Sequence, residues 1–196
     1  MTSGKHLNIR ELQNLSNREL GKLFPIVMAE PDPDWPMAFE MERSQLLGLL
    51  GENLARKIEH VGSTSVPGLL AKPTIDIILD IPAGPRPKKE IIPMLTSSGY
   101  IHMHQQENHI MMVKGYTPRG MEVPSYHIHL GSFHQKELKE MQIFRDILRS
   151  DAETAGAYAR LKTGLAQRYK HDREGYTQAK TDFIKRALKG HGHPNP

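Results

Sequence analysis

The run Thr74–Ile81, of sequence TIDIILDI, constrains the fold more than any other segment of the chain. It is rich in β-branched side chains and alternates with a period of two, which is the pattern of a β-strand. The alternation divides the strand into two faces, with Asp76, Ile78 and Asp80 on one and Ile75, Ile77 and Leu79 on the other. The sequence therefore predicts a strand that presents carboxylates on a single face.

Hydrophobic periodicity and turn residues predict the other elements. Strands are expected at Ile26–Glu30, Tyr100–His104, His109–Lys114 and Val123–Gly131. Helices are expected after the capping box of Ser16 and Glu19, over Trp35–Lys57 and Arg86–Ser98, and in three segments beyond Phe133, the last two starting at Ser150 and Asp172. A mixed sheet followed by a run of helices is an α+β layout.

The length of 196 residues is that of one domain, or of a domain with a short appendage. We expect a single unit over residues 1–189, with a sheet part at about 25–133 and a helical part at about 134–189. The sequence GHGHPNP at 190–196 is expected to form a flexible tail.

Composition excludes several classes of protein and of chemistry. The chain has no cysteine, which excludes disulfides, thiolate nucleophiles and cysteine zinc sites. No apolar run approaches the roughly 18 to 20 residues that span a bilayer, and Met1–Arg10 lacks a secretory signal, so we expect a cytoplasmic protein without membrane contact. Residues 136–189 hold 13 basic and 8 acidic side chains. This bias favours anionic partners such as a nucleotide or RNA, with an ordinary solvated helical surface as the alternative.

A short turn before the Asp76 strand is the sharpest functional feature. Its residues Gly62, Ser63, Thr64 and Ser65 offer backbone N–H groups and hydroxyls that can cradle phosphate oxygens. Lys72 lies between this turn and Asp76 and can offset phosphate charge. The alternative is a turn that uses glycine only for its conformation.

Several segments give the chain a resemblance to a known family. They are HVGSTSVPGLLAKPTIDIILDI at His60–Ile81, YHIHL at Tyr126–Leu130, and the stretches Val27–Arg43, Phe144–Tyr169 and Asp172–Ile184. On these segments the chain resembles the GrpB family, whose fold is that of the nucleotidyltransferase superfamily. The resemblance implies a nucleotidyltransferase-like mixed sheet followed by packed C-terminal helices, and chemistry on a nucleotide.

The resemblance also implies roles for individual residues. Nucleotidyltransferases place a Gly-Ser turn before a strand with Asp-x-Asp or Asp-x-Glu, so Gly62 and Ser63 match the turn and Asp76 matches the first carboxylate. The second carboxylate is missing, because Ile78 stands two residues after Asp76. Asp80 lies about 13 Å along the strand from Asp76, too far to share a magnesium ion bound at about 2.1 Å.

The counterpart of the third carboxylate is expected on the strand Tyr126–Leu130, where His127 and His129 share one face. Two histidines at i and i+2 can chelate a metal or bind phosphate, and ordinary half-buried imidazoles are the alternative. Asp76, His127 and His129 therefore form the predicted metal site, with Asp76 and His129 as the expected catalytic residues. Imidazole ligands shift the preference from magnesium toward zinc, manganese or nickel.

Four further residues are weaker candidates. Arg145, Lys180 and Tyr176 lie in the helical segments that resemble the family, where a cation can neutralise a triphosphate or an RNA end. Ion pairs with nearby acids, and a core position for Tyr176, are the alternatives. His60 directly precedes the Gly-Ser turn and can reach the same pocket.

Three functions follow from these residues. The first is metal-assisted transfer of a nucleotidyl group from a nucleoside triphosphate to an unknown acceptor, with magnesium, manganese or zinc. The second is a non-catalytic module that binds a nucleotide or an RNA end and lacks the second acidic metal ligand. The third is a hydrolase that depends on a metal bound by His127 and His129.

Overall fold

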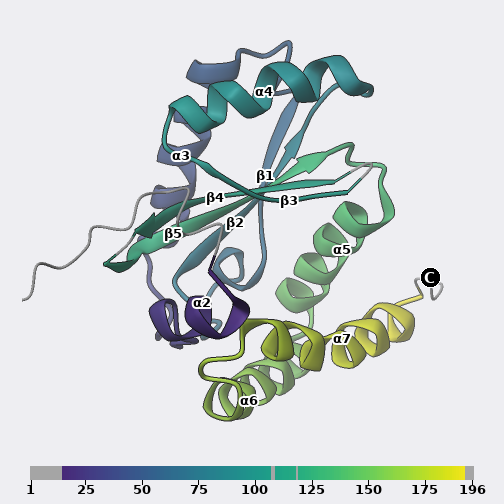
Figure 1. Ribbon diagram of the computed structural model, residues 1–196. Helices are drawn as coiled ribbons and strands as arrows, with labels where there is room; N and C mark the ends of the chain where they lie inside the picture. Colours follow the sequence, from purple (N-terminus) through teal and green to yellow (C-terminus); the bar gives the residue numbers. More distant parts are fainter. Residues whose placement is uncertain (1–14, 107–108, 118, 193–196) are drawn as a thin grey trace, which may run out of the picture.

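The fold combines one mixed β-sheet with helices on both of its faces (Figure 1). The computed structural model describes residues 15–106, 109–117 and 119–192. Its elements are α2 (Asn17–Leu23), α3 (Trp35–Leu50), β1 (Lys57–Val61), the 3₁₀ turn η1 (Ser63–Ser65), β2 (Thr74–Asp80), α4 (Pro85–Ser97), β3 (Ile101–Gln105), β4 (Ile110–Thr117), β5 (Gly120–Gly131), α5 (Lys136–Ser150), α6 (Ala152–Arg168) and α7 (Arg173–Gly190). The α+β class, with a mixed sheet followed by packed C-terminal helices, is confirmed.

The five strands lie in the order β1-β2-β5-β4-β3. The central strands β2 and β5 are parallel, and every other neighbouring pair is antiparallel. In the parallel register, Asp76 lies opposite His127, and Ile78 lies opposite His129. Because side chains alternate along a strand, these four residues point to the same face of the sheet.

The opposite face carries the largest hydrophobic core. Ile75, Ile77 and Leu79 of β2 are fully buried there against α3 and α4. On the Asp76 face, α5, α6 and α7 form a second layer that packs on the segment after η1 through Val66 and Leu69. Figure 1 shows α3 and α4 on one side of the sheet, and α2 with α5 to α7 on the other. Asp76 thus faces the layer of helices, with its side chain still 26% exposed.

One strand prediction and one helix prediction need correction. The segment 26–30 is not a strand, because its one sheet-like contact is an isolated bridge between Ala29 and Ala71. Ile26 packs instead against Ala166 and Tyr176 of the helical layer. The expected helix Trp35–Lys57 is also too long, because α3 ends at Leu50, where Gly51 follows with a positive φ of 69°, and the chain forms β1 from Lys57.

The helix starts follow capping chemistry. The capping box of Ser16 and Glu19 is present, and Asp172 begins α7 by accepting a hydrogen bond from the Gly175 N–H. The start of α6 was misassigned, since Asp151 rather than Ser150 accepts from the N–H groups of Glu153 and Thr154.

The expected tail at 190–196 begins within α7. Gly190 is the last residue of α7, and residues 193–196 of the expected tail lie outside the described residues. In the parts of the chain that the structure describes, no helix combines the length and apolar composition needed to cross a membrane.

Candidate metal and phosphate site

The glycine of the turn is required by its contact with Asp76. Gly62 has a φ of 71°, in the region that favours glycine, and a Cβ atom there would lie 2.2 Å from Asp76 Oδ2. Val61 pairs with Asp76 across β1 and β2, so the register brings the turn directly against this carboxylate. The predicted adjacency of the Gly-Ser turn and Asp76 is therefore present.

Asp76, His127 and His129 converge on the face of the sheet that the helices cover. His127 Nδ1 lies 3.1 Å from Asp76 Oδ1, and His129 Nε2 lies 3.8 Å from the same oxygen. One ligand atom from each residue lies within 4.8 Å of the other two, and among the described residues no other group of three or more His or acidic side chains does so. These three residues are called the triad below.

The second ring nitrogen of each histidine of the triad, the one that does not face Asp76, contacts another side chain. Tyr116 Oη lies 2.8 Å from His127 Nε2, and Arg173 Nη2 donates to Tyr116 Oη at 2.7 Å. His109 Nε2 lies 3.1 Å from His129 Nδ1, with the two rings stacked at 5.2 Å. The nitrogens that face Asp76 are therefore His127 Nδ1 and His129 Nε2, and the remaining nitrogens are engaged by other side chains.

Burial and hydrogen bonding set the charges of the triad. Burial lowers the pKa of His127 to about 4, so this imidazole is neutral near pH 7. Its Nδ1–H then donates to Asp76, and its Nε2 accepts from the Tyr116 hydroxyl. Burial alone would raise the pKa of Asp76, but hydrogen bonds from His127 and His129 hold that pKa well below its usual range. Asp76 is thus a carboxylate at all ordinary pH values.

A buried apolar side chain occupies the position of the second carboxylate of the superfamily pattern. Ile78 is fully buried between Val61 and Leu138, so its position faces α5 rather than open space. Asp80 lies at the end of β2, where its Oδ1 accepts a hydrogen bond from the Phe133 N–H at 3.0 Å. The prediction that Asp80 does not reach the metal position agrees with this geometry.

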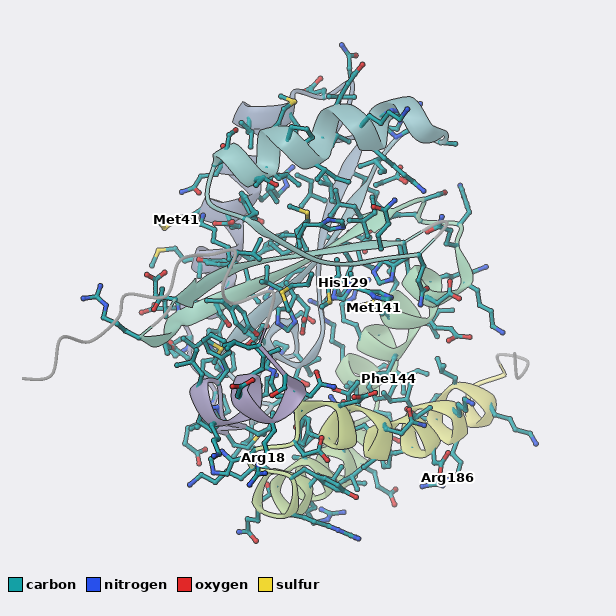
Figure 2. All side chains as sticks on the ribbon, in the orientation of Figure 1. Arg18, Met41, His129, Met141, Phe144 and Arg186 are labelled. Atoms are coloured by element: carbon teal, nitrogen blue, oxygen red, sulfur yellow. The ribbon has the colours of Figure 1, made fainter. Side chains whose placement is uncertain are left out.

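A cavity of about 800 Å³ opens in front of the triad. Its lining includes four cations, Lys72, Lys162, Arg173 and Lys180, together with Ser63, Tyr176 and Glu174. Figure 2 labels His129 and Met141, two other lining residues, where the sheet meets the helical layer. The cavity therefore joins the triad to a cluster of positive charge.

The three lysines that line the cavity all have lowered pKa values. Burial, reinforced by neighbouring cations, lowers the pKa of Lys72 to about 7, and burial with Lys180 nearby does the same for Lys162. Burial also lowers the pKa of Lys180, whose Nζ lies 4.5 Å from the centre of the Tyr176 ring. An anion in this cavity would relieve the cost of charging these lysines.

Lys162 is a site residue that sequence reasoning missed. Its Nζ lies 2.9 Å from Ser63 Oγ and 2.5 Å from the Leu70 carbonyl oxygen, and the residue is 2% exposed. The signal was present, because Tyr158, Lys162 and Ala166 recur at i, i+4 and i+8 and so place a lysine on the apolar face of α6. Arg173, directly after the cap of α7, was missed as well.

Some predicted phosphate ligands lie elsewhere. Thr64 Oγ1 donates to the Thr74 carbonyl at 3.0 Å, and Ser65 Oγ donates to the Gly62 carbonyl at 2.6 Å. His60 points to the opposite face of the sheet, because it pairs with Ile77 in the register. There its Nε2 contacts Thr64 Oγ1, and its ring stacks on Phe39. These three side chains support the turn and do not line the cavity.

Arg145 does not line the cavity but joins α5 to strand β1. Its Nη1 donates to Glu59 Oε2 at 2.8 Å and to the His60 carbonyl at 3.1 Å, and its Nε donates to Asp146. The ion pair with a neighbouring acid, one of the alternatives considered from the sequence, is thus present. Lys72, Lys180 and Tyr176, in contrast, all line the cavity.

Comparison with known proteins places the chain in a family. The sequence model of the family described as GrpB protein matches residues 25–190. The chain belongs to the GrpB family. A UPF0157 protein from Pseudomonas aeruginosa is 40% identical to this GrpB protein over 162 residues, which are 80% of the chain but only 64% of the relative.

A solved structure also resembles this GrpB protein closely. The crystal structure of the conserved protein GrpB from Enterococcus faecalis has a TM-score of 0.71 and 29% identity, covering 84% of this chain and 99% of that one. The Cid1 poly(U) polymerase is more distant, with a TM-score of 0.42 and 12% identity over 80% of this chain and 50% of its own. Those values have no bearing on activity.

The donor set of this GrpB protein fits a divalent metal. Ligating histidines usually donate their second ring N–H to an acceptor. A metal at His127 Nδ1 would require the tautomer opposite to that of the free protein, with Nε2–H donating to Tyr116 Oη. His109 Nε2 lies at the second nitrogen of His129 and can accept the proton there. Two imidazoles and one carboxylate favour manganese, zinc or nickel over magnesium.

Proposed function

We propose that this GrpB protein binds a nucleoside triphosphate with a divalent metal and transfers the nucleotidyl group to an acceptor. The observation that carries the proposal is the triad at one wall of a cavity whose other walls bear Lys72, Lys162, Arg173 and Lys180. A triphosphate and a divalent cation are complementary to that charge arrangement.

In this reaction some residues would bind the metal and others the triphosphate. Asp76, His127 and His129 would hold the metal, which when bound polarises the phosphate that it contacts. Lys162 and Lys180 would bind the triphosphate, and Ser63 would orient it through a hydroxyl that Lys162 already positions. The acceptor oxygen would displace pyrophosphate at the α-phosphorus, a reaction that depends mainly on positioning and electrostatics.

A specific observation favours a second candidate, a non-catalytic module that binds a nucleotide or an RNA end. Ile78 is buried at the position where the superfamily pattern has its second carboxylate. The triad therefore offers one carboxylate, whereas the two-metal mechanism needs ligands that bridge two ions. Such a module would bind the triphosphate through the lysines and release no pyrophosphate.

Thermal shift measurements with ATP, GTP, CTP and UTP test the proposal, each with Mg²⁺, Mn²⁺, Zn²⁺ or no metal. A nucleotide at 100 times its dissociation constant stabilises the native state by about 2.7 kcal/mol, which raises Tm by roughly 5 to 10 °C. We expect a metal-dependent shift together with release of pyrophosphate when an acceptor is present. A shift without metal and without pyrophosphate would identify the binding module, and no shift with any triphosphate would overturn both.

A matched pair of variants on α7 serves as the control. Lys180→Met removes a cation that lines the cavity, whereas Lys185→Met removes an exposed one on the same helix. We expect Lys180→Met to abolish most of the nucleotide-induced shift and Lys185→Met to keep it. Equal shifts in the two variants would contradict the assignment of the cavity as the phosphate site.

The lowered lysine pKa values predict a pH dependence of nucleotide binding. Lys72 and Lys162, each with a pKa of about 7 in the free protein, must be charged to bind a triphosphate. Affinity is therefore expected to fall at least about tenfold between pH 7 and pH 9, with proton uptake on binding. Calorimetry in buffers of different ionisation enthalpy measures this uptake, and its absence would contradict the prediction.

The lowered pKa of Lys72 also predicts a pH dependence of stability, opposite in direction to that of nucleotide affinity. Between about pH 7 and pH 10 the unfolded chain keeps protons on Lys72 that the folded chain releases, so the free energy of unfolding of the free protein rises with pH. Lys72→Met should raise Tm at pH 6.5 by several degrees and flatten the rise, while weakening nucleotide binding. A lower Tm for this variant in calorimetry would contradict the account.

A further inference from the structure

A second, smaller cavity adjoins the one that contains the triad. It has a volume of about 110 Å³, and Phe24, Ile101, Val113 and Tyr116 form part of its lining. Leu20, Met103, Met111, His127 and Arg173 line both cavities. A single ligand can therefore occupy both, with His127 of the triad at their junction.

The polar atoms that border the small cavity already bind one another. Tyr116 Oη contacts His127 Nε2, and Arg173 donates through Nη2 to Tyr116 Oη and through Nη1 to the Phe24 carbonyl at 3.0 Å. His127 Nδ1 faces Asp76. A group with hydrogen-bonding edges would have to displace these contacts, because a buried polar group without a partner is costly.

The size of the small cavity limits what it can hold. An apolar cavity of about 150 Å³ in another protein binds benzene. At about 110 Å³, with an open side toward the larger cavity, this one suits roughly four to six carbon atoms. Met103 is 41% exposed and borders both cavities, so a ligand that enters would cover apolar surface that now meets water.

We infer that the small cavity is a binding site for a short apolar group, a branched alkyl or a phenyl, carried by the second substrate. This inference rests on the proposed function, since that group would place the acceptor beside the triad while the triphosphate occupies the lysine side. The acceptor is therefore a small compound with an apolar end and a nucleophilic polar end. The nucleobase, whose edges need hydrogen-bond partners, would lie in the larger cavity.

Two rings of equal shape test the chemistry of the small cavity without any nucleotide or metal. Benzene and pyrimidine are titrated into the full chain with ¹³C-methyl methionine, and the resonances of Met103 and Met111 are followed. Met37 and Met41 are 59% and 61% exposed on α3 and serve as internal controls, and Figure 2 labels Met41 at the left edge of the view, away from His129. The probes report on the cavity directly, so failure here is distinct from failure of the triphosphate tests.

We expect benzene to shift the Met103 and Met111 resonances saturably, with a dissociation constant on the order of 1 mM. Pyrimidine should bind at least tenfold more weakly, and Met37 and Met41 should not move. Pyrimidine binding as tightly as benzene would overturn the inference in favour of a nucleobase site. Shifts at all four methionines, or none at Met103 and Met111, would overturn the assignment of a binding site.

A pair of variants on α2 locates the binding. Leu20 lines both cavities, whereas Leu23 packs in the same hydrophobic cluster without lining either. Leu20→Trp should remove the benzene response by filling the cavity, and Leu23→Trp should keep it, with unchanged Met37 and Met41 resonances showing that both variants are folded. Retention of the response in Leu20→Trp would contradict the proposed location.

Discussion

Replacing Asp76 by Asn is expected to lower the affinity of the protein for Mn²⁺ or Zn²⁺ by at least about 100-fold. The amide has nearly the same shape but no charge, and Asp76 supplies the one carboxylate of the triad. A metal held by two neutral imidazoles and an amide lacks the anionic ligand that offsets its charge. Calorimetric titration with each metal measures the loss.

The same substitution should also weaken triphosphate binding in the presence of metal and abolish release of pyrophosphate. Removing the carboxylate lowers the lysine pKa values further, because Asp76 is the nearby anion that favours the charged forms of Lys72, Lys162 and Lys180. Nucleotide binding at pH 8 should therefore suffer more than binding at pH 6.5. Titrations at these two pH values measure this second effect.

Asp80→Asn is the matched control for this experiment. Asp80 lies on the same strand and the same face as Asp76, and its Oδ1 accepts from the Phe133 N–H, a bond that an asparagine oxygen can also accept. We expect normal metal binding in this variant. If Asp76→Asn folds and binds Mn²⁺ as tightly as Asp80→Asn does, the triad is not the metal site.

Gly62→Ala is expected to destabilise the fold and to disrupt the triad together. A Cβ atom at this position would lie 2.2 Å from Asp76 Oδ2, and the φ of 71° is strained for alanine. Backbone strain of about 1–2 kcal/mol and overpacking of about 1–3 kcal/mol predict a fall in Tm of roughly 5 to 15 °C. Because the methyl group displaces the Asp76 carboxylate, metal affinity should fall as well.

Gly68→Ala separates these two effects. Gly68 has a φ of 72°, almost the same as Gly62, but a Cβ atom there would meet no atom within 4 Å. It should show only the backbone strain, with a small fall in Tm and unchanged metal affinity. Thermal unfolding and metal titration of both variants test the claim, which fails if the two alanine substitutions behave alike.

The order of strands and helices could largely be predicted from local sequence. The alternation in Thr74–Asp80 and the apolar stripes after residue 133 gave the correct element types, because burial on one face imposes a period on the chain. The errors in the predicted elements lie where one or two residues determine whether a helix ends or a strand forms. A single glycine, Gly51, follows the last residue of α3 and stops the helix. The edge strand β1 carries Lys57 and Glu59, which pair with each other, so this strand has no clear hydrophobic alternation.

The candidate site could be predicted only in part, for a physical reason. The even spacing of His127 and His129 placed them on one face of their strand, and the resemblance to the nucleotidyltransferase pattern linked that face to Asp76. The lysine cluster depends instead on how α6 and α7 lie over the sheet, which no local pattern encodes. Local sequence likewise does not show that the hydroxyls of Thr64 and Ser65 donate to backbone carbonyls and not to a ligand.

The sequence by itself determined the class of fold and the resemblance to the GrpB family, because these depend on periodicity and on residue types at fixed spacing. Through that resemblance it also linked Asp76 to His127 and His129. Only the tertiary structure decided which cations face Asp76, that Arg145 and His60 support the turn, and that an apolar cavity adjoins His127. Several of those features depend on contacts between residues far apart in the chain, as between Lys162 and Ser63 or between Arg145 and His60. Packing of the helical layer on the sheet establishes such contacts.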